Sequence, residues 1–111
     1  MHGVFVTGTG TGVGKTVVAA GILRWLRARG LDAVPMKPIQ TGCEPAKEPG
    51  APPRAPDLEF ALAAAGLTPS AAEMNLMCPY RFEPACSPHL AGRLAGRCAD
   101  LDVIELCARE L

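Results

Sequence analysis

Apolar and polar positions along the first third of the chain follow the order of a parallel α/β unit. Residues 4–7 (VFVT) form a short β-branched and aromatic run that predicts a strand. Residues 14–29 have the spacing of an amphipathic helix, and residues 33–37 predict a second strand. Pro35 within this second run favours an edge or irregular position. A strand, a glycine-rich turn, a helix and another strand predict an α/β fold.

The pattern also predicts how the first helix is oriented and how it ends. Four apolar residues share one of its faces: Val18, Ile22, Trp25 and Leu26. Gly30 occupies the position of a C′ glycine, where a left-handed conformation ends the helix. Arg27 and Arg29 are placed to interact with the negative end of the helix dipole.

Proline and glycine divide the middle of the chain. Residues 42–56 contain five prolines and two glycines, which predicts a mobile surface loop rather than a domain linker. Residues 57–65 predict a short helix that ends at Gly66, and residues 74–82 are expected to be extended or irregular.

Two helices are predicted in the last quarter. Ser87 and Pro88 are typical of an N-cap and a first helical position, and this helix should reach about Ala95. Residues 101–105 (LDVIE) could be taken for a strand that ends in an acid. Because apolar residues repeat at helical spacing as far as Leu111, we predict a helix instead.

The segment GTGTGVGKT, residues 8–16, is typical of a phosphate-binding loop. Such a loop needs a tight backbone whose N–H groups converge on an anion, a lysine and a hydroxyl for Mg²⁺. Glycines at alternate positions permit that backbone, and Lys15 and Thr16 supply the other two groups. The spacing is a variant, because Thr9 stands at the expected glycine position. The alternative is a structural glycine turn followed by a solvated lysine.

Composition narrows the class of protein. The 111 residues allow one domain at most, and 11 basic residues balance 11 acidic ones, so no global charge predicts binding to nucleic acid or a membrane surface. No apolar run reaches the roughly 18 residues that span a bilayer, and the first residues lack signal-peptide features, so we expect a cytoplasmic protein. The five cysteines lack metal-site spacing and are expected to be reduced.

Two further stretches, KPIQTG at 37–42 and CSPHLAG at 86–92, join the loop to one family. Together with VTGTGTGVGKT they resemble ATP-dependent dethiobiotin synthetase, which closes the ureido ring in biotin synthesis. The resemblance implies a three-layer P-loop NTPase-type parallel sheet that acts as a homodimer. Residues 1–111 would be the N-terminal portion of a single ATP-binding synthetase domain, with its C-terminal part absent.

The resemblance also implies the reactants. These are 7,8-diaminononanoate, CO₂ and ATP as substrates, with Mg²⁺ as the metal ion. An amine of the substrate takes up CO₂ to give a carbamate, ATP phosphorylates the carbamate, and the second amine closes the ring. Dethiobiotin, ADP and phosphate are the products.

Site residues follow from matching the family's motifs to this sequence. The resemblance assigns ATP binding to Gly12, Val13, Gly14, Lys15, Thr16, Val17 and Asp57. Thr16 and Asp57 would hold Mg²⁺, and Lys15 and Lys37 would be catalytic. Thr11, Lys37 and Thr41 would contact the substrate. Lysines and Mg²⁺ suit this chemistry, because phosphorylating a carbamate brings two anions together.

Several of these residues also have simpler explanations. Lys37 could be a solvated lysine at the carboxyl end of a strand, and Asp57 could be only a helix N-cap. Thr41 could be a turn threonine before Gly42. The segment with Ser87 and His89 is explained as a helix start, and the amine chemistry does not require a base there.

Two other functions remain open from the sequence. A P-loop ATPase of the amide-forming or partitioning class would share the loop, and a non-catalytic nucleotide-binding module would suit a short chain. A two-strand parallel sheet leaves faces and edges uncovered, so we expect the isolated chain to expose apolar surface, to be marginally stable and to be inactive.

Overall fold

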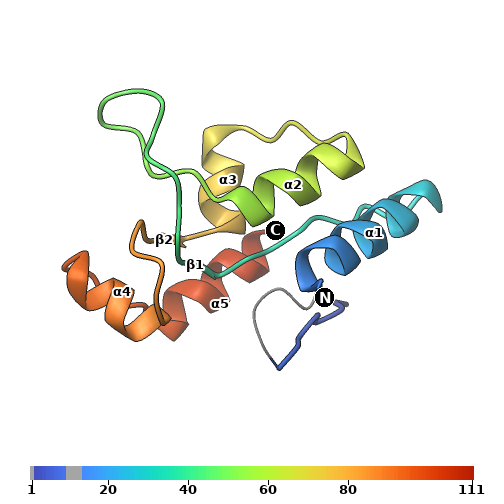
Figure 1. Cartoon of the computed structure of the whole chain (residues 1–111). Helices are drawn as coiled ribbons and strands as arrows, with labels where there is room; N and C mark the ends of the chain where they lie inside the picture. The colour runs from blue at the N-terminus through green and yellow to red at the C-terminus, as the bar shows by residue number, and fades with distance from the viewer. Residues whose placement is uncertain (1, 10–13) are drawn as a thin grey trace.

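The computed structural model describes residues 2–9 and 14–111. In chain order its elements are α1 (Lys15–Ala28), β1 (Ile39–Gln40), α2 (Pro56–Ala65), α3 (Ala71–Met77), β2 (Tyr80–Arg81), α4 (Pro88–Leu94) and α5 (Leu101–Glu110). Figure 1 shows α1 beside α2, with the two strands between the α2–α3 pair and the α4–α5 pair.

The two strands are parallel, as the α/β pattern predicts. Ile39 pairs with Tyr80 and Gln40 with Arg81. Backbone bonds extend this pairing on both sides, because the Lys37 N–H donates to Met77 O at 2.8 Å and the Cys43 N–H donates to Phe82 O at 2.9 Å. The chain is therefore an α/β unit with a two-stranded parallel sheet.

The strand predicted over residues 4–7 is wrong for this structure. Val4 and Phe5 are 66% and 89% exposed, and the segment pairs with no other strand among the described residues. A strand is stable only when a neighbour supplies its hydrogen bonds and apolar cover. Neither is present within the described part of the chain, so a β-branched run alone does not form the strand.

The second predicted strand is displaced toward the C-terminus. Residues 33–37 are not a strand, and pairing begins at Ile39. Proline at 35 and 38 removes two backbone donors, and the segment becomes a strand only where β2 lies opposite. Lys37 consequently precedes a strand, which corrects the prediction that it lies at a strand's carboxyl end.

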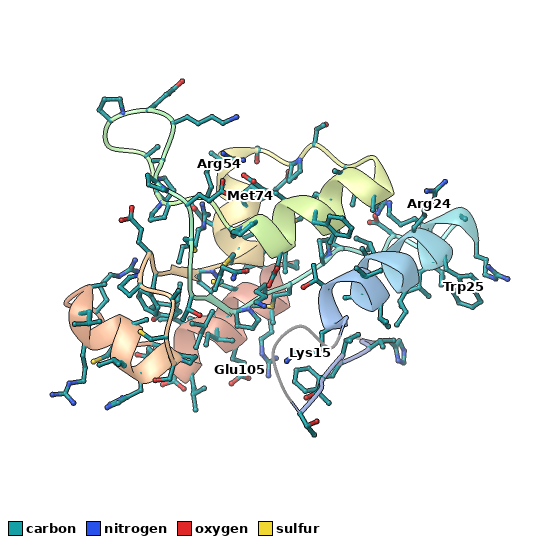
Figure 2. The ribbon with its side chains drawn as sticks, viewed as in Figure 1. Lys15, Arg24, Trp25, Arg54, Met74 and Glu105 are labelled. Carbon is teal, nitrogen blue, oxygen red and sulfur yellow. The ribbon has the colours of Figure 1, made fainter. Side chains whose placement is uncertain are left out.

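Helix α1 buries a different face from the predicted one. Ala20 and Leu23 are its buried residues, and they pack against Ala61 of α2. Val18 and Trp25 are each 53% exposed, and Figure 2 shows Trp25 projecting outward from α1. The α2 contact decides this outcome, because small residues on both helices let the helices approach closely.

The predicted helix ends are confirmed in geometry. After α1, Gly30 has φ +82°, its N–H donates to Arg27 O at 3.0 Å, and the Leu31 N–H donates to Leu26 O at 3.3 Å. This is the pair of bonds that defines a Schellman motif. Gly66, with φ +68°, ends α2 in the same way.

Helix α3 was missed, because residues 74–77 were expected to be extended or irregular and are helical. Ser70 and Glu73 start this helix with a capping box, in which each side chain accepts a hydrogen bond from the other residue's N–H. The Ser-x-x-Glu spacing is visible in the sequence and was the available signal. Only Tyr80 and Arg81 form a strand in the 74–82 region.

The final two helices agree with their predictions. Ser87 caps α4, since its hydroxyl accepts from the Leu90 N–H, and the segment LDVIE lies in α5. Phe82 is 1% exposed and packs with Tyr80 and Ala91. Large apolar side chains nevertheless remain exposed, as predicted, among them Val17, Leu94, Leu101 and Leu106.

The loop between β1 and α2 is closed at its base. The Glu44 and Arg54 N–H groups donate to each other's carbonyl oxygens at 3.0 and 2.7 Å. The Arg54 guanidinium also pairs with Glu44 and with Glu59 of α2. All five cysteines are free in this structure. No helix in the described residues is long and apolar enough to cross a membrane.

Candidate nucleotide and metal site

The start of α1 is arranged for an anion. Gly14 is the N-cap with φ +92°, a left-handed conformation that favours glycine, and no side chain caps the helix. The first turn contains no acidic residue. The free N–H groups at a helix start and the positive end of the helix dipole are features that bind phosphate. Gly14, Thr16 and Val17, which the sequence assigns to ATP, lie at this helix start.

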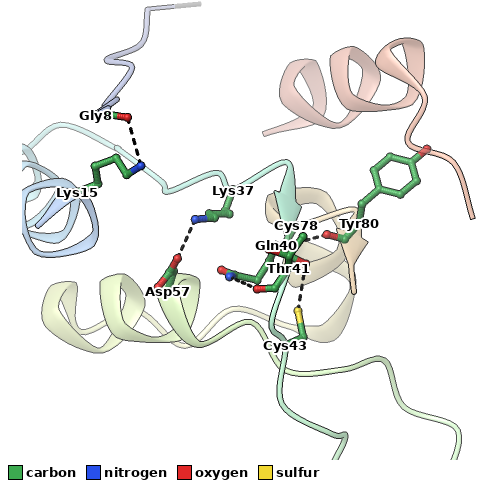
Figure 3. Close-up of polar contacts among 9 residues, drawn as sticks. All are labelled: Gly8, Lys15, Lys37, Gln40, Thr41, Cys43, Asp57, Cys78 and Tyr80. Atoms are coloured by element: carbon green, nitrogen blue, oxygen red, sulfur yellow. Dashed lines mark hydrogen bonds and ion pairs between the residues drawn. The ribbon is translucent and has the colours of Figure 1, made fainter. Parts of the chain in front are cut away.

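The Lys15 side chain contacts the segment that precedes α1. Its Nζ lies 3.4 Å from the carbonyl oxygen of Gly8, on the other side of the glycine-rich segment (Figure 3). A lysine at a helix start is the group that reaches the terminal phosphates in a phosphate-binding loop. Three predicted site residues, Thr11, Gly12 and Val13, lie outside the described residues, so their assignments stay predictions.

Lys37 and Asp57 form an ion pair next to this loop. Lys37 Nζ lies 2.7 Å from Asp57 Oδ2, and the side chains are 41% and 35% exposed. Lys37 comes from the segment before β1, where its N–H is fixed by Met77 O. Asp57 lies in the first turn of α2. Figure 3 shows the two side chains reaching toward each other.

Asp57 does not cap its helix. The N-cap of α2 is Ala55, and no side chain accepts a capping bond there. The N-cap explanation of Asp57 is therefore wrong, and its carboxylate is free to interact outside the helix. Its location in the first turn is still favourable for a negative charge, because the helix dipole is positive there.

The surroundings of Asp57 keep its carboxylate ionised. Burial acts to raise the pKa of Asp57, but the hydrogen bond and the charge of Lys37 oppose this. The side chains of Thr16 and Gln40 act in the same direction as Lys37, and the pKa of Asp57 lies below its ordinary value of 3.8. These contributions place Thr16 and Gln40 close to the same carboxylate as Lys37.

The predicted metal pair, Thr16 and Asp57, comes from the first turns of α1 and α2, 41 residues apart in the chain, and the Thr16 side chain is among the groups that lower the pKa of Asp57. A carboxylate and a hydroxyl are hard oxygen ligands, which Mg²⁺ prefers. The described residues contain no group of three or more His, Cys, Asp or Glu that could hold a metal. An ion here would suit Mg²⁺ at a nucleotide site, where one carboxylate, phosphates and water complete the coordination.

Thr41 follows β1 directly, and its carbonyl oxygen accepts from Gln40 Nε2 at 2.7 Å. Gly42 has φ +66°, so the chain turns immediately after Thr41. A turn role and a substrate contact are both compatible with this position.

Gln40 is the residue that sequence reasoning missed. It is 7% exposed, and it is the one polar side chain that is buried among the described residues. The sequence held no clear signal for it, because the predicted strand ended at residue 37 and β1 is Ile39–Gln40.

The fold and these groups define an α/β protein with a glycine-and-lysine phosphate-binding loop. Comparison with known proteins agrees. A family model described as an AAA domain (AAA_26), a family of P-loop NTPases, matches residues 2–110, and the chain belongs to this family.

Curated relatives give the more specific resemblance. Proteins named ATP-dependent dethiobiotin synthetase BioD match from Anaeromyxobacter sp. (strain K), with 43% identity over 111 residues, and from Chromohalobacter salexigens, with 45% over 100 residues. The matches cover 100% and 90% of this chain but 45% and 40% of the relatives. A third, from Haloferax mediterranei, is 41% identical over 99% of the chain and 42% of the relative. The resemblance predicted from the sequence is confirmed, and the chain spans less than half the length of these relatives.

Proposed function

We propose that this chain functions within an ATP- and Mg²⁺-dependent synthetase, which converts 7,8-diaminononanoate and CO₂ into dethiobiotin. The observation that supports this most directly is the meeting of Thr16, Lys37 and Asp57 next to an uncapped helix start. The names of the relatives supply the reaction class, which is an ATP-dependent ligase of biotin biosynthesis.

Each residue has a role in this proposal. The start of α1 and Lys15 hold the ATP phosphates, and Thr16 and Asp57 hold Mg²⁺. The ion would neutralise phosphate charge. Lys37 Nζ stabilises the carbamate oxygens as they approach the terminal phosphate, and Thr41 and Thr11 orient the substrate. Cations at this point lower the barrier, because two anionic groups must react with each other.

The Lys37–Asp57 pair fits this division of roles. Both side chains are partly exposed, so an incoming ligand can reach them. With a cation held by Asp57, Lys37 Nζ would be available to an anion. The proposal also includes a homodimer in the cytoplasm, as the resemblance implies.

The test measures binding and turnover with the purified protein. Calorimetry with ATP and Mg²⁺ is expected to show binding to the purified chain. Because the isolated chain is expected to be inactive, turnover is measured on the synthetase that contains this sequence, where 7,8-diaminononanoate and bicarbonate are expected to give dethiobiotin by mass spectrometry, with one phosphate released per product. Lys37→Met is the variant expected to keep ATP binding and lose product.

Two outcomes would favour the other functions. ATP hydrolysis that is indifferent to 7,8-diaminononanoate would indicate a P-loop ATPase of the amide-forming or partitioning class. ATP binding without turnover and without 7,8-diaminononanoate binding would indicate a non-catalytic nucleotide-binding module.

A further inference from the structure

The contact between Lys37 and Asp57 differs from the other ion pairs of the fold. Among the ion pairs of the described residues it is the one that contains a lysine. Lys37 Nζ contacts a single carboxylate oxygen, Asp57 Oδ2, at 2.7 Å. Arg54, by contrast, holds Glu59 of the same helix through both carboxylate oxygens, at 3.1 and 2.8 Å. A two-point arginine contact fixes a carboxylate, whereas a lysine on a flexible stem makes a contact that can exchange.

The structure allows this exchange without a change of fold. The Lys37 N–H donates to Met77 O at 2.8 Å and Asp57 lies in the first turn of α2, so both backbones are held in place. Both side chains are partly exposed, and Figure 3 shows Lys37 reaching from the segment before β1 to the carboxylate. An exposed ion pair contributes little to folding stability. Only the Lys37 side chain therefore has to move when another cation competes for Asp57.

A divalent cation on Asp57 is incompatible with the observed position of Lys37. Mg²⁺ binds a carboxylate oxygen at about 2 Å. An ammonium that is hydrogen-bonded to the same carboxylate at 2.7 Å would then lie close to the ion. Charges of the same sign at such a separation repel each other, and a partly buried site screens them less than water does. The cation and the Lys37 ammonium therefore compete for one carboxylate.

We propose that Lys37 is an exchangeable counter-ion of Asp57. Lys37 Nζ leaves the carboxylate when a divalent cation binds there, and the released ammonium then binds the anionic group of the substrate. Each ligand favours the other, because coupling between two binding sites is reciprocal. The inference rests on the metal-binding role proposed for Asp57, and it adds that Lys37 is held away from anions until the cation is bound.

The affinity for Mn²⁺ tests the competition. The probe is Mn²⁺ without ATP, measured as the free ion by electron paramagnetic resonance in the synthetase that contains this sequence. Lys37→Met is expected to bind Mn²⁺ about fivefold more tightly or better, as is typical of coupled sites, whereas Lys37→Arg keeps the charge and should show no gain. Unchanged or weaker Mn²⁺ binding in Lys37→Met would overturn the proposal, and so would unchanged binding in Asp57→Asn.

Arg54→Met is the matched control. It also removes one positive charge from a partly exposed contact with a carboxylate of α2, in this case Glu59. Its Mn²⁺ affinity is expected to equal that of the wild type, because the ion pairs of Arg54 are with Glu44 and Glu59 rather than with Asp57. An equal gain of affinity in Arg54→Met and Lys37→Met would mean that Mn²⁺ responds to overall charge, and would contradict competition at Asp57.

Chemical labelling of the wild type measures the release of Lys37 directly. The chain has three lysines, Lys15, Lys37 and Lys47, and Lys47 is exposed in the loop between β1 and α2. Because the contact with Asp57 shields Nζ, Mn²⁺ is expected to raise the acetylation rate of Lys37 by acetic anhydride relative to that of Lys47. In Asp57→Asn, Lys37 should react at the faster rate with or without Mn²⁺. A wild-type Lys37 rate that does not respond to Mn²⁺ would overturn the proposal.

The two levels of the hypothesis fail separately. If Mn²⁺ releases Lys37 and Lys37→Met binds Mn²⁺ more tightly, but 7,8-diaminononanoate gives no product, then the exchange stands and the synthetase function is wrong. If dethiobiotin forms but neither the labelling of Lys37 nor the Mn²⁺ affinity of Lys37→Met changes, then the function stands and the exchange is wrong.

Discussion

Lys37 Nζ and Asp57 Oδ2 lie 2.7 Å apart, although 20 residues separate them in the chain. One comes from the segment before the first strand and the other from the first turn of α2. The sequence gives reasons to assign each residue to a ligand site, but it does not say that they contact each other. If Asp57 binds a cation and Lys37 binds an anion, as proposed, their contact links the two binding events.

Lys37→Met should remove the catalytic contribution of Lys37 with little change in the stability of the fold. Because the pair is partly exposed, its loss should change the free energy of unfolding by no more than about 1 kcal/mol. In the synthetase that contains this sequence, we expect product formation from 7,8-diaminononanoate to be abolished while ATP still binds. Urea denaturation and product analysis measure the two effects. Arg109→Met, which removes an exposed pair with Glu105 on α5, is the control and should leave ligand binding unchanged.

Acid should remove the contribution of Asp57 to stability. Its pKa is lowered in the folded protein, so the contribution is complete above the ordinary value of 3.8 and is lost as the pH falls through the lower folded value. Urea midpoints of the wild type and Asp57→Asn should therefore differ at neutral pH and converge in acid. A difference that grows on acidification would contradict the low pKa of Asp57.

Replacing each of two glycines at and within α1 with alanine should change the stability of the chain in opposite directions. Gly14 has φ +92°, so Gly14→Ala should destabilise the chain by about 1–2 kcal/mol and weaken ATP binding. Gly21 lies inside α1 with open space around it, so Gly21→Ala should stabilise by about 0.5–1 kcal/mol. Thermal unfolding and ATP titration test both. Equal effects of the two changes would mean that Gly14 does not need its left-handed conformation.

The five thiols should react in the order of their exposure. Cys98 is exposed and should be modified first by a disulfide reagent at mildly alkaline pH. Burial raises the pKa of Cys78 to about 11, so little of it is thiolate and it should react among the slowest, with buried Cys43. Mass spectrometry after timed quenching gives the order. All five should react in guanidinium chloride, and early modification of Cys78 in the folded chain would contradict its burial.

Local signals in the sequence were reliable where one short segment determines the outcome. The starts and ends of helices followed from Ser87, Gly30 and Gly66, because a cap or a left-handed glycine acts within a few residues. The capping box of Ser70 and Glu73 was an equally local signal that was overlooked.

Strands were predicted less well, because their hydrogen bonds come from elsewhere in the chain. Residues 4–7 have strand composition but no partner among the described residues, and β1 begins only where β2 lies opposite. The buried face of α1 depended in the same way on α2, which packs on Ala20 and Leu23 and leaves Trp25 outside.

The sequence by itself determined the phosphate-binding segment, the helix ends and the resemblance to dethiobiotin synthetase, because each of these depends on residue types at fixed short spacing. Only the tertiary structure decided that Lys37 pairs with Asp57, that Thr16 lies near the same carboxylate, and that Gln40 is buried behind them. These relationships depend on how α1, β1 and α2 pack, and packing is set by contacts between residues that are distant in the chain.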